Sequence, residues 1–450
     1  MASTILSRTQ GTPTNADKWT FSVWVKSSNP DTLNEGKIMG TYVDANNYVS
    51  LGFNSEKKMS FYAHGGGAEV GQLKTNRRIR DPGAWYHFVY VWDTAASATD
   101  RMRIYVNGEE QTSFATDTNP ALNLDSLINT SGNVINIGTN NPSAASSQFF
   151  QGVMAHIHFC DGQAYAASDF GETDATSGIW VAKSGPSVTY GNNGFFLKMA
   201  SGALGTDSSG NGNTMAVTGT MTNTKDTPDN NFCTINPLAF AADGFTIVNA
   251  NTAISAVTDT ASYTVYGTMA VNTGKWYWEA KAVNVDSTSY RHSHGIGDVE
   301  YAVQADVGEA GDQTNAWTYG NNGGYKTGGS GGQESGDYLS YETGDFLMFG
   351  LDCDNAKLYL GKNGTWKKSG VPTSGATGTG AISIVADRTY APAFVMRYAA
   401  NQVAANFGNG YFGTTSHGET NADDAGIGLF KYDVPAGYYA LCTNHFGDQS

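Results

Sequence analysis

Short stretches in which apolar and polar residues alternate recur along this 450-residue chain, and they are the main guide to its fold. The stretch KWTFSVWVK would place Trp19, Phe21 and Val23 on one face of a strand and Thr20 on the other. Trp24 interrupts the polar face, which indicates that this face is covered as well. Further stretches with strand character in the first half are residues 47–53, 58–64, 85–92, 101–107, 133–139 and 152–160. This spacing predicts an antiparallel β-sandwich.

The dipeptide Asn-Gly occurs between two alternating stretches in each half of the chain, at Asn107-Gly108 and at Asn363-Gly364. Both central residues of the favoured two-residue hairpin turn need positive φ, which Asn and Gly adopt most readily. We therefore predict an all-β protein made of two antiparallel β-sandwiches in tandem.

The composition agrees with many tight turns and few surface helices, because glycine is abundant (55 residues) and charged residues make up only 15% of the chain. A formal charge of −15 argues against nucleic acid as a partner. No stretch reaches the ~20 apolar residues of a membrane span, so we expect no membrane insertion. Residues 1–10 lack the charged and apolar segments of a signal peptide, so we expect no export by the ordinary secretory route.

The four cysteines, Cys160, Cys233, Cys353 and Cys442, lie far apart and show no CxxC pairing. Two disulfides are possible by number, but such a thin distribution in a large chain is more typical of buried free thiols. We expect free thiols.

Residues 15–175 contain WTFSVWVK, GAWYHFVYVWD with RMRIYVNGEE, INIGTNN and FQGVMAHIHFCDGQAYAASDF, in that order. These segments resemble the laminin-G-like or concanavalin-A-like jelly roll, in which a Trp-Tyr-His strand runs toward a Tyr-Val-Asn-Gly hairpin. The resemblance implies a jelly-roll sandwich that binds ligands through its loops.

Five segments of the second half resemble the SPRY family, in the family's order: GKWYWEAK, HGIGDV, TGDFLMFGLDCDNAKLYLGKNGTW, YAPAF and VAANFG. Between the two halves, a polar run with two prolines around residues 220–237 is typical of a connection. We therefore predict a jelly roll at 1–222, a linker at 223–240, a SPRY-like sandwich at 241–412 and a short C-terminal tail at 413–450.

The closing phrase LFKYDVPAGYYALCT, with a jelly roll and a SPRY-like domain before it, resembles structural proteins of marine bacteriophages. The resemblance implies a virion protein that is assembled in the host cytoplasm and exposed on the particle surface. Its partners would be other virion proteins and a host-surface glycan or protein. Because virion appendages repeat, we expect a homo-oligomer, with a trimer as our guess.

The glycine-rich segment at residues 319–338, together with Trp317 just before it, carries the candidate ligand-binding aromatics Trp317, Tyr319, Tyr325 and Tyr338. Sugars and proteins favour exposed aromatic rings with adaptable polar neighbours, so this segment is a candidate recognition loop. The alternative is a flexible surface loop without a binding role.

Two metal sites are worth testing. Asp207, Asn211 and Asn213 in DSSGNGN offer the oxygen ligands that calcium prefers, but the same residues are good turn formers. His156 and Cys160, with His158 between them, would share one strand face and offer zinc ligands, although a flat strand rarely gives tetrahedral geometry.

Signals of catalysis are weak. Retaining glycosidases of the jelly-roll superfamily resemble one another in a Glu-x-Asp-x-x-Glu strand, whereas here Glu172 and Asp174 are followed by Ser177. No GxSxG elbow and no P-loop pattern occurs in the sequence. A catalytic Ser-His-Asp triad is a further alternative, since the composition does not exclude one.

We therefore expect a non-enzymatic virion structural protein, either a fibre or a decoration of capsid or tail, that mediates adhesion or host-surface recognition. The first alternative is a polysaccharide-degrading glycoside hydrolase of the concanavalin-A-like superfamily. The second is a purely structural virion joint.

Overall fold

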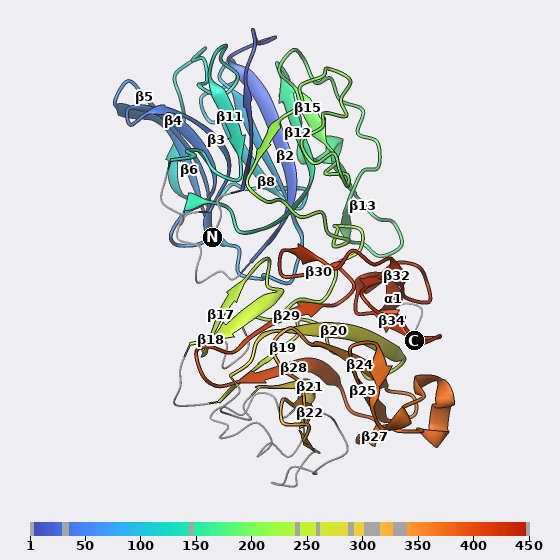
Figure 1. Ribbon diagram of the computed structural model, residues 1–450. Coiled ribbons are helices and arrows are strands. Elements are labelled where there is room, and N and C mark those ends of the chain that lie inside the picture. Colours follow the sequence, from blue (N-terminus) through green and yellow to red (C-terminus); the bar gives the residue numbers. More distant parts are fainter. Residues whose placement is uncertain are drawn as a thin grey trace. The chain divides into compact units, whose positions relative to one another are not determined.

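The computed structural model describes residues 4–28, 36–143, 148–238, 244–257, 262–286, 292–300, 316–326 and 340–446 (Figure 1). The chain divides into two compact units, Met1–Asn223 and Thr224–Ser450. Every strand pairing among the described residues lies within one unit.

Two antiparallel sheets form the first unit. In the part that the structure describes, the eight-stranded sheet has the order β10-β6-β5-β4-β3-β11-β1-β16 and the six-stranded sheet the order β15-β12-β2-β7-β8-β9, with β13 and β14 as a separate pair. The bounds are β1 (Ile5–Thr9), β2 (Lys18–Ser27), β3 (Lys37–Asp44), β4 (Asn47–Phe53), β5 (Lys58–Gly65), β6 (Ala68–Arg78), β7 (Tyr86–Asp93), β8 (Met102–Val106), β9 (Glu109–Glu110), β10 (Phe114–Thr118), β11 (Val134–Ile137), β12 (Gly152–Asp161), β13 (Gly171–Thr173), β14 (Trp180–Ala182), β15 (Phe195–Leu197) and β16 (Ala216–Thr218), with a 3-10 helix at Ala167–Asp169.

The core of this unit contains the apolar face of β2. Trp19, Phe21 and Val23 are fully buried in the main cluster, as their alternation predicts. The opposite face of β2 is covered too, since Trp24 is only 3% exposed. The outward face of the six-stranded sheet carries a second hydrophobic cluster, to which residues 164–190 contribute side chains.

Both Asn-Gly hairpins have the predicted geometry. The φ angles are 48° at Asn107 and 86° at Gly108, and 49° at Asn363 and 81° at Gly364. In each hairpin the Asn Oδ1 also accepts a backbone N–H from a neighbouring strand at 2.8 Å. The expectation of an all-β fold with two antiparallel sandwiches is confirmed.

The second unit has two principal sheets and two short strand pairs among its described residues. The nine-stranded sheet has the order β17-β18-β29-β20-β24-β25-β26, with β27 beside β25 and β34 beside β20; the five-stranded sheet has the order β19-β28-β21-β22-β23; β30 pairs with β31 and β32 with β33. The bounds are β17 (Phe245–Val248), β18 (Ala253–Ala256), β19 (Tyr263–Tyr266), β20 (Lys275–Asn284), β21 (His292–Asp298), β22 (Ala316–Gly320), β23 (Tyr325–Lys326), β24 (Phe346–Asp352), β25 (Lys357–Lys362), β26 (Thr365–Trp366), β27 (Ile382–Ser383), β28 (Tyr390–Met396), β29 (Gln402–Asn406), β30 (Tyr411–Phe412), β31 (Thr415–Ser416), β32 (Asn421–Ala422), β33 (Leu429–Phe430) and β34 (Tyr439–Ala440), with 3-10 helices at Lys367–Ser369 and Pro372–Thr377 and α1 at Thr443–Phe446.

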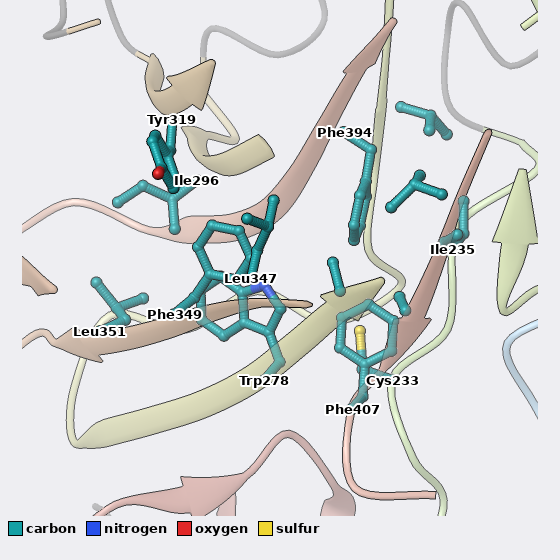
Figure 2. Packing of buried hydrophobic residues seen from close by; sticks show 14 of the residues in the cluster. Cys233, Ile235, Trp278, Ile296, Tyr319, Leu347, Phe349, Leu351, Phe394 and Phe407 are labelled. Atoms are coloured by element: carbon teal, nitrogen blue, oxygen red, sulfur yellow. The ribbon is translucent and has the colours of Figure 1, made fainter. Parts of the chain in front are cut away.

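The core of the second unit is built from side chains of both of its principal sheets (Figure 2). Trp278 of β20 stacks on Phe349 of β24, with ring centroids 5.3 Å apart. Ile296 and Phe394 of the five-stranded sheet are buried in the same cluster. This core is separate from the cluster that contains Trp19.

The predicted linker (223–240) and tail (413–450) require correction, because their described residues, apart from Asn223, are integral to the second unit. Phe232 and Cys233 of the expected linker are 0% and 1% exposed. In the tail, β34 pairs in parallel with β20, and Phe430 and Tyr438 are fully buried. These segments cover the outward face of β20, where Tyr277 would otherwise be exposed.

All four cysteines are free thiols, as expected. No helix of the described residues has both the length and the apolar character needed to cross a bilayer.

Candidate functional site

The aromatics of the predicted recognition loop are not displayed together. Trp317 and Tyr319 lie in β22 and are 3% and 0% exposed, so the prediction that they face a ligand is wrong. Strand β22 lies between β21 and β23, and all five of its residues are buried. Tyr325 is half-buried, with the ammonium of Lys368 4.6 Å from its ring centre. Tyr338 lies outside the described residues.

The carboxylate of the predicted calcium site is engaged within its own turn. Asp207 Oδ1 accepts the backbone N–H groups of Phe196 and Ser209, and Oδ2 accepts the Ser209 hydroxyl and the Asn213 N–H, at 2.8–3.0 Å. Partial burial alone would raise the pKa of Asp207, but these hydrogen bonds lower it below the ordinary value. The carboxylate therefore stabilises the turn.

The two asparagines of this set also hold the backbone. Asn211 Nδ2 donates to the carbonyls of Gly191 and Gly194, and Asn213 Nδ2 donates to those of Asn192 and Gly194. These hydrogen bonds fit the turn-forming alternative. Because asparagine ligates a cation through its Oδ1 atom and not through Nδ2, the calcium site stays a prediction.

The histidines of β12 do not converge on a metal. A bulge gives His156 a φ of 47° and interrupts the pairing of β12 with β2. His158 stacks on Phe196 with centroids 4.1 Å apart, and its Nδ1 is 2.9 Å from the Tyr190 hydroxyl. Burial raises the pKa of the Cys160 thiol. No group of three or more His, Cys, Asp or Glu side chains in the described ranges is placed to hold a metal ion.

One buried Ser-His pair occurs, but its geometry does not make serine a nucleophile. Ser22 Oγ is 2.8 Å from His87 Nε2, and Trp180 Nε1–H donates to His87 Nδ1 at 3.1 Å. Because Nδ1 accepts, Nε2 carries the hydrogen and donates to the serine. Burial is the main cause that lowers the pKa of His87 to about 3. A catalytic base would need the opposite tautomer and exposure to substrate.

The second unit contains a desolvated carboxyl, Glu279, on the outward face of β20. Its Oε1 accepts from the Tyr432 N–H and the Tyr277 hydroxyl, both at 2.9 Å. Its Oε2 accepts from the Lys431 N–H at 2.9 Å and from Asn406 Nδ2 at 3.4 Å. Burial raises the pKa of Glu279 to about 7, although these hydrogen bonds oppose the shift. With no exposed surface, Glu279 anchors the C-terminal segment and does not face a substrate.

The carboxylates of the weak glycosidase motif do not form a pair of catalytic groups. Glu172 is exposed in β13. Asp174 Oδ1 accepts the N–H groups of Thr176 and Ser177 and the hydroxyl of Ser177. Asp174 therefore closes a turn.

The outward face of the eight-stranded sheet carries four aromatic side chains on three adjacent strands, which we call the aromatic row: Tyr42, Tyr48, Tyr62 and His64. Tyr42 pairs across β3 and β4 with Tyr48, with ring centroids 6.1 Å apart. The Tyr48 ring lies 5.6 Å from Tyr62 and 5.2 Å from His64. Tyr42 is 38% exposed and the other three are half-buried. The aromatic row is thus a partly solvated apolar surface with polar edges.

The cross-strand neighbours of the aromatic row are small or uncharged. Ser50 of β4 pairs with Gly40 of β3 and with Tyr62 of β5. Gln72 of β6 pairs with Tyr62 from the other neighbouring strand. Glu69, opposite His64, is the only charged cross-strand partner among the described residues. Burial, followed by the hydrogen-bonded neighbour Tyr48, raises the pKa of Tyr62 to about 12, so its hydroxyl keeps its proton near neutrality.

Two buried amides adjoin the aromatic row at Gly40. Asn136 lies opposite Gly40, and a Cβ at Gly40 would come within 2.5 Å of the Asn140 Cβ, so glycine lets Asn140 pack on the strand. Asn136 and Asn140 are 2% and 5% exposed, and the Oδ1 atom of each has no hydrogen-bond partner among the described residues. Unsatisfied buried acceptors are uncommon, and they favour a water or a ligand hydroxyl at this position.

The sequence contained a signal for the aromatic row that the motif analysis missed. Tyr48, Tyr62 and His64 occupy positions of the predicted strands that alternate with buried Val49, Phe61 and Ala63. Large aromatic residues at solvent-facing strand positions are a signal of binding surfaces.

Residues 4–167 match the family described as the concanavalin A-like lectin/glucanases superfamily. The first unit is therefore similar to that superfamily over these residues, as the jelly-roll resemblance implied. A comparison with curated proteins found no match.

The solved structures similar to this chain include two SPRY domains and a pentraxin. The SPRY domain of human HERC1 is 14% identical, with 38% of this chain and 96% of that one covered and a TM-score of 0.28. The heptameric SAP-like pentraxin from Limulus polyphemus is 18% identical, with 41% and 87% covered and a TM-score of 0.30. The TRIM65 PSpry domain is 11% identical, with 39% and 91% covered and a TM-score of 0.29.

Proposed function

We propose that this chain is a non-enzymatic binding protein whose first unit holds a neutral glycan on the aromatic row. The observation that carries the proposal is the partly exposed row itself, a set of rings on three adjacent strands next to uncharged hydrogen-bonding groups. The match of residues 4–167 to a superfamily named for lectins and glucanases supports a carbohydrate ligand.

A sugar suits this surface chemically. Its C–H faces pack on aromatic rings, and its hydroxyls donate to and accept from neutral polar groups. The tyrosine hydroxyls and Gln72 provide such groups along the row, whereas Ser50 is buried. Cross-strand neighbours without Lys or Arg favour a neutral glycan over an anionic one.

A glycan array with the full chain tests the proposal. Tyr42→Ala and Tyr62→Ala should each reduce binding of the best neutral glycan at least about tenfold, because each removes an aromatic contact and a hydroxyl. Val43→Ala is the matched control: Val43 is 51% exposed and adjoins Tyr42 in β3, so binding should be unchanged. Glycan binding that persists in both tyrosine variants would refute the assignment of the site.

We further propose that the binding protein is a virion component of a phage, a fibre or a decoration of capsid or tail. The similarity of the C-terminal phrase to marine bacteriophage structural proteins supports this setting. Imaging of intact particles with the chain located by a bound antibody fragment tests it, and a trimer at each position is the expected oligomer. Failure to find the chain in purified particles would refute the virion assignment without affecting the glycan site.

Within that setting, the same variants separate adhesion from a purely structural role. Particles with Tyr42→Ala should assemble normally and lose adsorption to host cells if the row is the adhesive surface. Loss of assembly with unchanged adsorption of the remaining particles would instead favour the structural joint. Hydrolysis of a bound polysaccharide by the purified chain would favour the glycoside hydrolase alternative.

A further inference from the structure

Two lysines of the second unit converge on one aromatic ring. Phe346 begins β24, opposite Lys281 of β20, and the Lys281 Nζ lies 5.4 Å from the Phe346 ring centre. Lys431, from the C-terminal segment, places its Nζ 4.9 Å from the same ring centre and 5.5 Å from that of Tyr432. The rings of Phe346 and Tyr432 meet edge to face at 6.1 Å. All four side chains are half-buried, so part of each is open to solvent.

The two lysines of this cluster, Lys281 and Lys431, form no ion pair with the described part of the chain, whereas several other lysines do. Two like charges around one ring repel each other, and cation–π attraction at partly solvated sites is weak. An anion between or beside them would relieve the repulsion.

Two carboxylates next to the cluster in the chain, Asp345 and Glu279, have other hydrogen-bond donors. Asp345, next to Phe346 in the chain, accepts from Lys362 Nζ at 3.3 Å and from Asn363 Nδ2 at 2.6 Å. Glu279, two residues before Lys281, accepts from the N–H groups of the C-terminal segment. Since the whole chain carries a charge of −15, two lysines without an ion pair in the described residues, beside half-buried rings, are a local exception.

We infer that the cluster of Lys281, Phe346, Lys431 and Tyr432 is a binding site for an anionic saccharide, one that carries a carboxylate or a sulfate ester. The two ammonium groups would bind the anion, and the rings of Phe346 and Tyr432 would contact the C–H face of the sugar. This site lies in the second unit and does not involve the aromatic row. The chain would thus bind two chemically different parts of a glycan surface.

Calorimetric titration of the full chain tests the inference with three probes: an oligogalacturonate for the carboxylate, a sulfated galactan oligosaccharide for the sulfate, and a neutral galactan oligosaccharide. At least one acidic probe should bind more tightly than the neutral one, and its affinity should fall as ionic strength rises. The relative affinity of the two acidic probes distinguishes a carboxylate ligand from a sulfate ligand. Equal binding of acidic and neutral probes would overturn the inference.

Single substitutions test whether the acidic probe binds at this cluster. Lys281→Gln and Lys431→Gln should each weaken the acidic probe about tenfold, the effect of losing one charge-assisted contact. Burial, Glu279 and Asp345 raise the pKa of Tyr432, and exposed Glu419 adds to this shift. Glu419 thus places negative charge near Tyr432, so Glu419→Gln should strengthen binding severalfold. Lys225→Gln removes an exposed lysine of the same unit and should have no effect.

Two controls keep the outcome interpretable. Melting curves of the lysine variants should match the wild-type curve, since both side chains are partly solvated. Tyr42→Ala should leave binding of the acidic probe unchanged, which separates this site from the aromatic row. Acidic binding that is lost with Tyr42→Ala and retained in Lys281→Gln would overturn the inference.

Discussion

An aromatic ring from a later segment of the chain lies over the glycine of each Asn-Gly hairpin. A Cβ at Gly108 would lie 2.7 Å from the Trp180 ring, and one at Gly364 would lie 3.0 Å from the Tyr432 ring. Each glycine therefore meets two requirements, positive φ and close approach of a ring. Only the first of these can be inferred from the dipeptide itself.

A matched pair of substitutions separates the two requirements. Gly108 and Gly132 share a φ of +86°, but no atom lies within 4 Å of a Cβ at Gly132. Gly132→Ala should lower the free energy of unfolding by about 1–2 kcal/mol, the cost of a left-handed alanine. Gly108→Ala should lower it by a further 1–3 kcal/mol or so, because the Trp180 ring must move. Chemical denaturation followed by tryptophan fluorescence measures both, and equal losses would contradict the role assigned to Trp180.

At the scale of elements, the C-terminal segment is a third layer on the nine-stranded sheet. Phe430 packs edge to face on Tyr277 at 4.9 Å, and β34 extends the sheet beside β20. The carboxyl oxygens of Glu279, on β20, accept the backbone N–H groups of residues 431 and 432 in the C-terminal segment. The polar composition of residues 413–450 concealed this role, because a few buried side chains are enough to attach a segment that is otherwise turns.

The buried Glu279 makes this attachment depend on pH. Its pKa is raised by burial from an ordinary 4.5 to about 7, so between these values the folded chain holds a proton that the unfolded chain has released. The stability contributed by the protonated group is fully present below about pH 4.5 and is lost as pH rises through about 7, a total of about 3 kcal/mol. Glu279→Gln should lack this pH dependence.

The comparison requires denaturation curves of wild type and Glu279→Gln at several pH values. Burial lowers the pKa of His292 to about 4, so its contribution is lost as pH falls from about 6.5, in an overlapping window. Because both proteins contain His292, the difference between their curves isolates Glu279. A difference that does not change between pH 4.5 and 7 would show that Glu279 titrates normally.

At the scale of the whole molecule, each unit has its own hydrophobic core, and no described strand pairing links them. We therefore expect fragments 1–223 and 224–450 to fold separately. Fragment 224–412 should not fold, because it lacks the layer over Tyr277 and the backbone carbonyl of Leu441, to which Cys233 N–H donates at 2.8 Å.

Thiol labelling with mass spectrometry reports the outcome. Cys233 is 1% exposed and should stay protected in 224–450 but react rapidly in 224–412. Cys160, which is also buried, should stay protected in 1–223. Protection of Cys233 in the shortened fragment would show that the C-terminal segment is dispensable for the core.

The strands, both hairpins and the division of the chain into two sandwiches could be predicted because their causes are local. Alternation assigns Trp19 and Phe21 to a buried face wherever the strand is placed, and positive φ at Asn107-Gly108 depends on those two residues alone. The exposure of an aromatic side chain has no such local cause. It depends on what packs against the second face of its strand.

The lack of a local cause for exposure explains why the sequence pointed to one set of aromatic rings and the structure to another. Trp317 and Tyr319, next to a glycine-rich segment, are covered on both faces, whereas Tyr42 and Tyr62, in ordinary alternating strands, are only partly covered. The sequence by itself determined which segments become strands and where they turn, through side-chain periodicity and backbone φ. Only the tertiary structure decided which rings meet solvent, and which charges lack a partner, because both follow from contacts between residues far apart in the chain.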